Sequence, residues 1–443
     1  MLIGVLVMLI DRFGRRSVSC SITLNNFINF LSNKPALFSR DVNWCYVHED
    51  RSILEKDDWL FVESREMANG YIEAKSYKVV GRHRVIFLLS SMDDFDLEET
   101  GTANAVELLR DSAVSLYGYD LVRKLAMFVR TSPDSDLTTA AFLYDAQFRQ
   151  AEFVYTVSFD QLDQLVSCLP QVEEDKIIFI FSTGRCGSTL ISKFFELLPD
   201  CISLSEPDYA YMFLAIIDPE MRVKLLEWGT RLSCRAIGPR KGRYFALKYR
   251  SEVTETARVL MELFPRSKSV YLYRRCFDHF KSCSIAFQLF SSDTFMGVFP
   301  PERQKALWQY LKAGHGHMDR IDLNSPVDLF SLAWQNNVLH CKRLIDDGFR
   351  ILCIRYEEIQ RVPEAVFRVL LDFCALPADW LQFGLPALER DSQEGSELSR
   401  AQVNATREQN TPKPEHYKRI AEVLALNVEV PTSDYLLPGT FQP

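Results

Sequence analysis

Short apolar runs alternate with helical patterns through the second half of the chain. Residues 177–181 are Ile and Phe without interruption, as in a strand of a parallel sheet that is buried on both faces. Leu190, Phe194 and Leu198 then recur at helical spacing, which predicts a helix packed on that sheet. The same patterns predict further strands at residues 244–249, 269–274 and 351–356, and helices at 208–232, 254–264 and 327–347. This alternation predicts an α/β fold of three layers with a central parallel sheet.

The first 170 residues have a more mixed pattern. Their predicted elements are strands at residues 59–62, 71–80 and 85–89, an acidic loop at 93–99, a mostly helical stretch at 104–129 and a short helix at 158–169. The alternating residues 71–80 are expected to pair with residues 85–89 through a turn at Gly81. We therefore predict a smaller α+β domain of unknown role over residues 1–170, followed by a second domain over residues 171–443.

The segment between the first buried strand and its helix is rich in small and polar residues. It reads Ser-Thr-Gly-Arg-Cys-Gly-Ser-Thr over residues 182–189. A loop of this kind binds anions, because free N–H groups and the positive end of the helix dipole point into it. Arg185 can grip two anionic oxygens, and Ser188 and Thr189 can donate to others. The alternative is a strand-to-helix turn that binds nothing.

The spacing of this loop separates it from two common nucleotide loops. The nucleoside-triphosphate loop needs a lysine before its Ser or Thr, and no lysine lies between Gly184 and Thr189. The dinucleotide pattern G-x-G-x-x-G is also absent from the segment. The loop resembles instead the phosphosulfate loop of sulfotransferases that use 3′-phosphoadenosine 5′-phosphosulfate (PAPS), which reads roughly T-x-[RK]-[SC]-G-[ST]-[ST]. Residues 183–189 match it throughout, and Glu206 with Pro207 matches a Glu-Pro of several family branches.

A second motif begins where the strand at residues 269–274 ends. Arg274 stands at the strand end, and Asp278 and Ser282 follow it on the next helix. Open parallel sheets bind ligands at this edge, and the spacing resembles the 3′-phosphate motif of the same sulfotransferases. The usual R-D-P opening is here Arg-Arg-Cys, so either Arg274 or Arg275 takes the phosphate; the spacing to Ser282 favours Arg274. The alternative is a basic helix start with solvated arginines.

Three further segments fit the same resemblance. Lys248, at a strand end, matches a Lys-bearing strand of the family, although a surface lysine would have the same sequence. Residues 355–376 resemble the R-Y-E-D-L…P…L-L-x-F-L-G-L segment, which is mainly architectural. Ser396, Ser399 and Arg400 lie in a stretch that matches the basic C-terminal loop closing the nucleotide site in many sulfotransferases; a solvated tail is the alternative.

The resemblance covers residues 175–400. It implies a P-loop-NTPase-like fold and transfer of a sulfuryl group from PAPS to a hydroxyl or amine of a small-molecule or carbohydrate acceptor. The implied cofactor-binding residues are Arg185, Cys186, Gly187, Ser188, Thr189, Arg274, Ser282 and Arg400. Glu206 is the implied general base and Arg185 the stabiliser of the leaving phosphate, with His279 and His315 as back-up bases. The alternative for Glu206 is that it only orients a helix or pairs with a lysine. No metal is expected, because fixed cations and amides carry the neutralisation.

Two other functions stay open at this point. A pseudoenzyme would bind PAPS or adenosine 3′,5′-bisphosphate (PAP) in the same pocket without transfer, with the N-terminal region as an interaction domain. A P-loop kinase would bind ATP with Mg²⁺, which the missing lysine disfavours. Tyr209, Tyr211 and Phe213 either line a substrate cleft or pack on the sheet, and residues 291–324 are expected to form a lid or substrate loop.

Charge and cysteine content indicate which binding partners and which cellular compartment to expect. The 443 residues carry a formal net charge of −8, so nucleic acid is not an expected partner. The 11 cysteines include no C-x-x-C pair, which favours free thiols in a reducing compartment. His315 and His317 fit a flexible loop better than a metal site.

The first ten residues are apolar but shorter than the ~20 that a membrane span needs. A buried strand is predicted there, and a truncated anchor stays open. We expect a cytoplasmic protein, with a Golgi-type anchor as the alternative.

Overall fold

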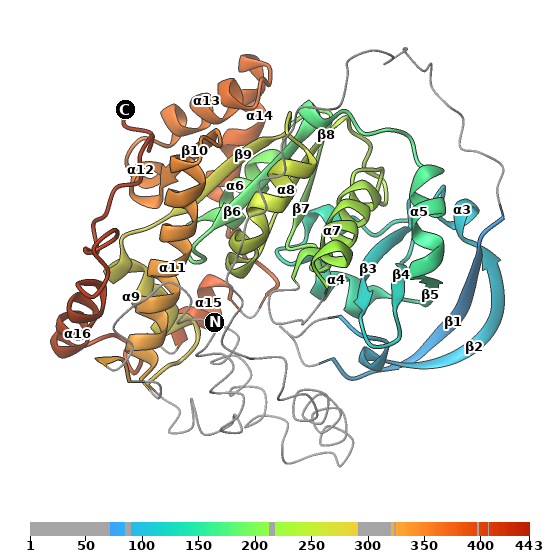
Figure 1. Ribbon diagram of the computed structural model, residues 1–443, viewed down its shortest axis with the longest axis horizontal. Helices are drawn as coiled ribbons and strands as arrows, with labels where there is room; N and C mark the ends of the chain where they lie inside the picture. Colours follow the sequence, from blue (N-terminus) through green and yellow to red (C-terminus); the bar gives the residue numbers. More distant parts are fainter. Residues whose placement is uncertain are drawn as a thin grey trace.

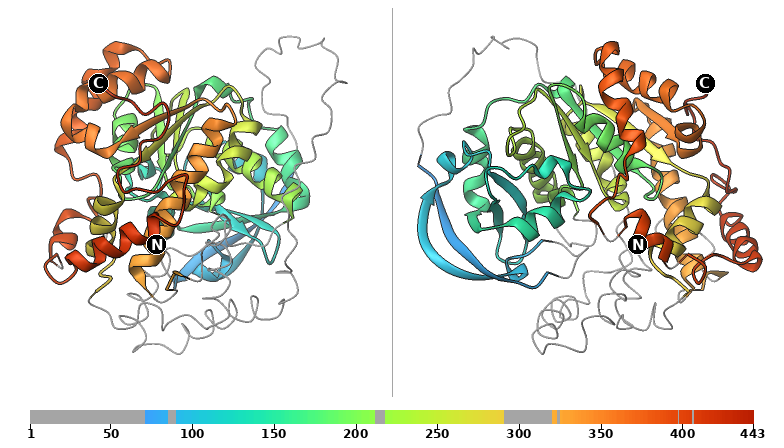
Figure 2. Two further views of the ribbon diagram at one scale, coloured as in Figure 1. Left: turned by 60° about the vertical axis from the view of Figure 1, so that its left-hand side comes forward. Right: turned by 180° about the vertical axis from the view of Figure 1, so that it is seen from behind.

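Two five-stranded sheets lie side by side in the computed structural model, which describes residues 71–84, 90–211, 218–290, 320–322, 325–396, 398–405 and 407–443 (Figure 1). One sheet is parallel, with strand order β10-β9-β6-β8-β7. The other is antiparallel, with order β2-β1-β5-β4-β3. Figure 2 shows the same arrangement from two other sides.

The parallel sheet is built around β6 (Ile177–Ser182). Its neighbours are β9 (Lys268–Tyr273) and β8 (Tyr244–Lys248), and its edges are β10 (Ile351–Arg355) and β7 (Cys201–Ser205). All residues of β6 are buried, because both faces of a central parallel strand are covered. Because these strands are parallel, the carboxyl ends of β6, β8 and β9 lie together at one end of the sheet.

Helices cover both faces of this sheet. One face, which includes Ile178 and Ile180, packs against α6 (Ser188–Glu196) and α13 (Pro363–Phe373). The opposite face, which includes Phe179 and Phe181, belongs to the core that contains α7 (Pro219–Ser233), α8 (Ala257–Leu263) and α11 (Pro326–Asp346). This arrangement confirms the predicted α/β fold around a central parallel sheet. The other helices of this half are α9 (Cys276–Ala286), α12 (Tyr356–Arg361), α14 (Leu381–Gly384), α15 (Arg400–Ala405) and α16 (Pro414–Leu424).

The antiparallel sheet occupies the N-terminal part of the described chain. Its strands are β1 (Glu73–Arg82), β2 (Phe95–Asn104), β3 (Val114–Asp120), β4 (Leu125–Arg130) and β5 (Phe153–Ser158). The helices between and after them are α3 (Ala105–Leu108), α4 (Leu143–Gln150) and α5 (Phe159–Ser167). The short helix predicted at residues 158–169 is confirmed by α5, whose Leu162, Leu165 and Val166 are buried.

Three predictions for this region are wrong. Residues 93–99 do not form a loop, because most of them lie in β2. Residues 104–129 are not mostly helical, because they hold the four-residue α3 and the paired strands β3 and β4. Every residue of β3 is buried, so this strand lacks the alternation that marks a half-exposed strand. Gly81 lies inside β1 rather than at a turn, and residues 59–62 and 85–89 lie outside the described residues.

The two sheets share buried side chains. Tyr119 of β3 donates a hydrogen bond to the backbone oxygen of Leu225 in α7 at 2.9 Å, and the rings of Phe159 and Trp228 lie 6.4 Å apart. One hydrophobic cluster contains all four residues. The boundary near residue 170 therefore stays a prediction.

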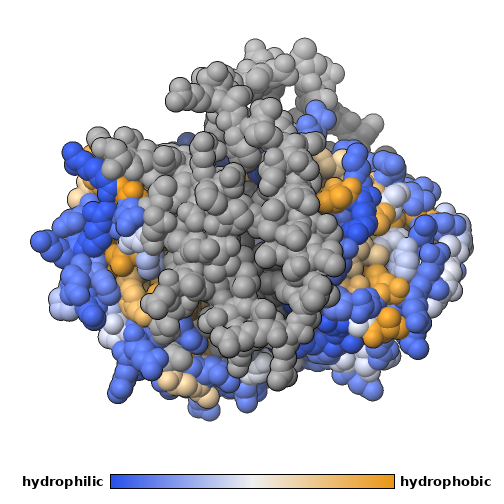
Figure 3. All heavy atoms as spheres, turned by 90° about the horizontal axis from the view of Figure 1, so that it is seen from below, coloured by the Kyte–Doolittle hydropathy of each residue, from blue (hydrophilic) through white to orange (hydrophobic). Residues whose placement is uncertain are grey.

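The described surface is mainly hydrophilic in the view of Figure 3, with small separate hydrophobic areas. No helix among the described residues is both long and apolar enough to cross a bilayer.

Candidate active site

The loop between β6 and α6 has a strained, left-handed backbone. Gly184, Arg185 and Gly187 have φ angles of 77°, 51° and 82°, and a positive φ is uncommon for a residue with a side chain such as Arg185. Gly187 is also the N-cap of α6. A Cβ at Gly187 would lie 2.8 Å from Cδ2 of Tyr356, so glycine is required there by both backbone angle and space.

Two arginines converge behind this loop. The Arg185 side chain donates from Nε to Oγ of Ser282 at 3.2 Å, and Nη1 of Arg274 donates to the Arg185 backbone oxygen at 3.4 Å. The Arg274 Nε is buried and has no hydrogen-bond partner among the described residues. Neither arginine forms an ion pair with a carboxylate in the described part of the chain. Burial lowers the pKa of Arg185, and the nearby Arg274 charge acts in the same direction.

The choice between Arg274 and Arg275 follows from where each side chain points. The guanidinium of Arg274 lies over the ring of Tyr356 at 4.6 Å and lines a cavity. The side chain of Arg275 is exposed, does not line that cavity, and has its Nε 3.6 Å from Oδ1 of Asp434. The geometry therefore favours Arg274 as the residue that meets a ligand, in agreement with the spacing to Ser282.

The cavity has a volume of about 500 Å³, within the ~300–1,000 Å³ range of small-molecule sites. Its lining includes Gly184, Arg185, Gly187, Ser188 and Thr189 from the loop and the start of α6, Asp278 and Ser282 from α9, and Phe142, Glu206, Tyr211, Lys248, Arg250 and Glu252 from other segments. Its cationic lining residues are Arg185, Lys248, Arg250, Arg274, Lys281, Arg390, Arg400 and Arg407, and its acidic ones are Glu206, Glu252, Asp278 and Asp391. An acidic protein thus has a cavity with surplus positive charge, which suits an anionic ligand.

Glu206 also lines the cavity and is held in a constrained position. It has a φ angle of 61°, its side chain is buried, and its backbone N–H donates to the Lys248 backbone oxygen at 2.6 Å. The Lys248 ammonium donates to Glu206 Oε1, and Nε of Arg250 lies 3.6 Å from Glu206 Oε2. Two cations therefore fix the orientation of this carboxylate.

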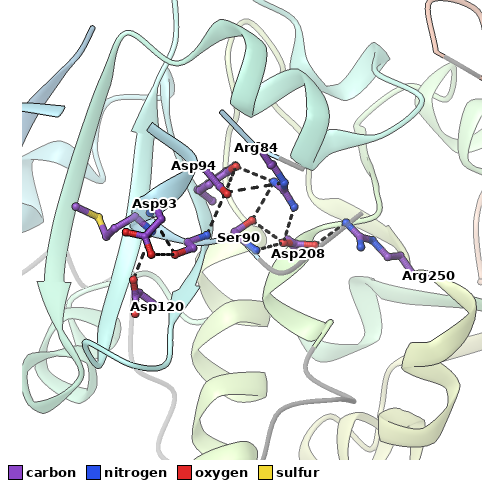
Figure 4. Close-up of polar contacts among 10 residues, drawn as sticks. Arg84, Ser90, Asp93, Asp94, Asp120, Asp208 and Arg250 are labelled. Carbon is purple, nitrogen blue, oxygen red and sulfur yellow. Dashed lines mark hydrogen bonds and ion pairs between the residues drawn. The ribbon is translucent and has the colours of Figure 1, made fainter. Parts of the chain in front are cut away.

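Arg250 also connects Glu206, through Asp208, to Arg84 beside the antiparallel sheet (Figure 4). Its Nη2 lies 2.7 Å from Oδ1 of Asp208, and Oδ2 of Asp208 accepts from Arg84 Nη2 at 3.1 Å. The backbone N–H of Ser90 donates to the same Asp208 oxygen at 2.8 Å. A buried chain of alternating charge thus joins Lys248, Glu206, Arg250, Asp208 and Arg84, which we call the ionic chain.

The C-terminal segment forms one wall of the cavity. The side-chain oxygen of Gln393 accepts from Nη1 of Arg185 at 2.9 Å, and its amide nitrogen donates to Oγ1 of Thr189 at 3.5 Å. Arg400 lines the cavity but is exposed, and its Nη2 donates to the Arg390 backbone oxygen at 3.4 Å. Ser396 and Ser399 do not line the cavity, and the Ser396 hydroxyl donates to the Gln393 backbone oxygen at 2.8 Å.

Comparison with known proteins gives similarity in structure alone. No family model matches the chain, and no curated protein matches its sequence. Among solved structures, it is similar to a sulfotransferase from Alicyclobacillus acidocaldarius, with 15% identity, a TM-score of 0.35, and coverage of 57% of this chain and 93% of that one. A sulfotransferase domain from the curacin biosynthetic pathway has 18% identity, a TM-score of 0.33, and covers 56% and 97%. A mouse sulfotransferase complexed with PAP has 14% identity, a TM-score of 0.33, and covers 60% and 87%.

All three of these solved structures are named as sulfotransferases, the family whose motifs the sequence resembles. The function proposed below rests on the residues of the cavity and not on these similarities.

Two other predicted site residues are buried beside the loop rather than exposed to the cavity. The Cys186 thiol donates to the Leu272 backbone oxygen at 3.2 Å, and Cys186 does not line the cavity. His279 is also buried, and its Nε2 lies 3.1 Å from the Thr183 backbone oxygen. Burial lowers the pKa of His279 to about 3, so the ring is neutral and positions the loop. His315 and His317 lie outside the described residues, and no metal-binding group of His, Cys, Asp or Glu occurs within them.

Sequence reasoning missed four residues of this site: Arg84, Asp208, Arg250 and Gln393. Arg250 had a weak signal, because it lies two residues beyond Lys248 at the end of the same strand. Arg84 and Gln393 had none, because the contacts that join them to the site, with Asp208 and Arg185, span more than a hundred residues of sequence.

Proposed function

We propose that this chain is a PAPS-dependent sulfotransferase that moves the sulfuryl group to a hydroxyl or amine of an acceptor and releases PAP. The observation that carries the proposal is the pair Arg185 and Arg274, which face one cavity at the end of a parallel sheet without a carboxylate partner in the described chain. Two cations without a carboxylate partner beside a strand-to-helix loop fit a ligand with more than one anionic group.

The donor's two anionic ends are assigned to different residues. The 5′-phosphosulfate lies in the loop, where Arg185 and the hydroxyls of Ser188 and Thr189 donate to its oxygens. The 3′-phosphate meets Arg274 and Ser282, with Arg400 beside them. This orientation directs the sulfuryl group along the cavity toward Glu206.

The reaction is an in-line transfer. A bond forms between the acceptor oxygen and sulfur while the bond from sulfur to the phosphate oxygen breaks, and that electron pair stays on the PAP phosphate. Negative charge grows on this oxygen, where Arg185 and the loop donors stabilise it. The acceptor proton goes to Glu206, which Lys248 and Arg250 hold in one orientation.

Binding of PAP without transfer is a second candidate function. It is favoured by the same ion pairs, because both oxygens of the Glu206 carboxylate already face cations, which compete with an acceptor hydroxyl for them.

Turnover of labelled PAPS with mixed hydroxylated acceptors separates the two functions. A transferase releases PAP in proportion to sulfated product, and Glu206→Gln lowers that rate by ~10²-fold or more while PAP affinity is retained. Saturable PAP binding with no sulfated product from any acceptor would assign the chain to the binding class.

A further inference from the structure

One acidic side chain in the cavity has an oxygen without a partner. Glu252 lies in the short helix η6 (Ser251–Thr256), just after β8, and lines the cavity. Its Oε2 is buried and accepts no hydrogen bond from any described residue. A buried carboxylate oxygen without a donor is costly and uncommon in native proteins, and a donor from a ligand in the cavity would remove that cost.

The other acidic residues of the cavity do not share this property. Glu206 is held by Lys248 and Arg250. Asp391 accepts backbone N–H groups of the C-terminal segment, at 3.1 Å and 2.8 Å. Asp278 is partly exposed, and none of its oxygens is both buried and without a partner. Among the acidic side chains that line the cavity in the described part of the protein, Glu252 is therefore the one with a buried oxygen that accepts no hydrogen bond.

The surroundings of Glu252 are aromatic as well as acidic. Tyr211 also lines the cavity, lies close enough to Glu252 to feel its charge, and is almost fully buried, and its ring stacks with the Arg250 guanidinium at 4.1 Å. Burial and then the nearby Glu252 charge raise the pKa of Tyr211 well above its ordinary value, so its hydroxyl stays neutral. Phe142, from the N-terminal part of the chain, adds a second ring to the lining. Neutral rings and an unmatched carboxylate together suit an organic cation.

We propose that Glu252 binds a protonated amine of the acceptor, so that the acceptors of this chain are hydroxylated amines. This inference rests on the proposed function, because it assigns the acceptor end of the same cavity. The cavity then takes an anionic donor between Arg185 and Arg274 and a cationic acceptor at Glu252. The acceptor hydroxyl lies between these ends, at Glu206.

Matched pairs of acceptors test the charge directly. Tyramine and 4-propylphenol share the phenol hydroxyl and differ in an ammonium against a methyl group. The pair 5-aminopentan-1-ol and hexan-1-ol makes the same comparison without a ring. For each pair we would measure the shift in unfolding midpoint in the presence of saturating PAP, and kcat/KM with labelled PAPS.

The ammonium member of at least one pair is expected to bind about tenfold more tightly than its neutral partner. Glu252→Gln removes that preference and leaves the neutral compound unchanged, whereas Glu252→Asp, which keeps the charge, retains part of it. Glu364→Gln removes an exposed carboxylate outside the cavity and leaves the preference intact.

Failure of this inference is distinguishable from failure of the proposed function. If PAP stabilises the protein but no ammonium compound is preferred over its neutral partner, the assignment of Glu252 is overturned and the donor site stands. The assignment is also overturned if Glu252→Gln weakens both members of a pair equally. If PAP itself gives no shift, the proposed function fails first.

Discussion

At the scale of single residues, Gln393 occupies the place where the loop would meet an anion. Its amide oxygen accepts from Arg185 and its amide nitrogen donates to Thr189, so it engages two of the proposed donors at once. A ligand phosphate has to displace these bonds. The neutral Gln393–Thr189 bond contributes only about 1 kcal/mol, and the Arg185–Gln393 bond, which has one charged partner, roughly 1.5–3 kcal/mol. A phosphate, which is itself charged, bonds more strongly to Arg185 than the neutral amide of Gln393 does.

Gln393→Glu is expected to weaken PAP binding about tenfold, because a carboxylate on Arg185 competes with the phosphate through a charge-assisted bond. Gln393→Ala is the matched control and should bind PAP as tightly as the wild type or slightly more tightly. Calorimetric titration measures both affinities. Equal affinities for the two variants would show that Gln393 is not in the anion's place.

Residue-level prediction from the sequence was possible where the signal is local. The loop residues and Arg274 with Ser282 lie within short motifs, and the structure brings Arg185, Ser188, Thr189, Arg274 and Ser282 to one cavity. The contact between Gln393 and Arg185 could not be predicted from the sequence, because the two positions lie 208 residues apart.

At the scale of elements, the strands of the parallel sheet were predictable because burial on both faces leaves an apolar run between polar ends. Burial on both faces also explains why the helical prediction for residues 104–129 was wrong. Strand β3 includes Tyr117, Gly118 and Asp120 and is buried throughout, so its sequence shows no strand alternation. A Cβ at Gly118 would lie 2.7 Å from Cβ of Ser90, so the glycine at this position reflects close packing between two segments.

The contact between α9 and the loop predicts a pH effect on stability. His279 has its pKa lowered to about 3 by burial, so the folded state binds fewer protons than the unfolded state between about pH 3 and pH 6.5. Its contribution to stability is complete above pH 6.5 and falls as pH decreases toward 3. The expected loss from this group between pH 7 and pH 5 is about 2 kcal/mol.

His279→Gln removes this titration, so urea unfolding of wild type and variant isolates it from other groups. The comparison is needed because Asp94, whose pKa burial raises to about 6, acts in the opposite direction over the same range. A difference in stability between the two proteins that does not change from pH 7 to pH 5 would contradict the buried, neutral histidine.

At the scale of the whole molecule, the ionic chain connects the two sheets at the end of the cavity. Asp208 accepts from Arg84, which follows β1, and pairs with Arg250, which follows β8 (Figure 4). Phe142 also reaches the cavity from the N-terminal part. The predicted α+β region therefore contributes to the candidate site, which no feature of its own sequence indicated.

Asp208→Asn is expected to destabilise the protein by roughly 3–5 kcal/mol, because it leaves two buried guanidinium groups without their shared carboxylate. Glu364→Gln is the matched control, since it breaks an exposed pair with Arg368 and should cost under about 1 kcal/mol. Urea unfolding measures both. If Asp208→Asn lowers the free energy of unfolding as little as the control does, the ionic chain does not hold the two sheets together.

The most direct test of the central claim is the unfolding midpoint of the protein with PAP, with ATP and Mg²⁺, and with neither. At a hundred times its dissociation constant, PAP should add ~2.7 kcal/mol of stability. The account predicts a shift with PAP that is lost in Arg185→Ala and in Arg274→Ala but kept in Arg275→Ala, whose exposed side chain lies outside the cavity. A shift with ATP and Mg²⁺ and none with PAP, or a PAP shift that survives both arginine changes, would contradict it.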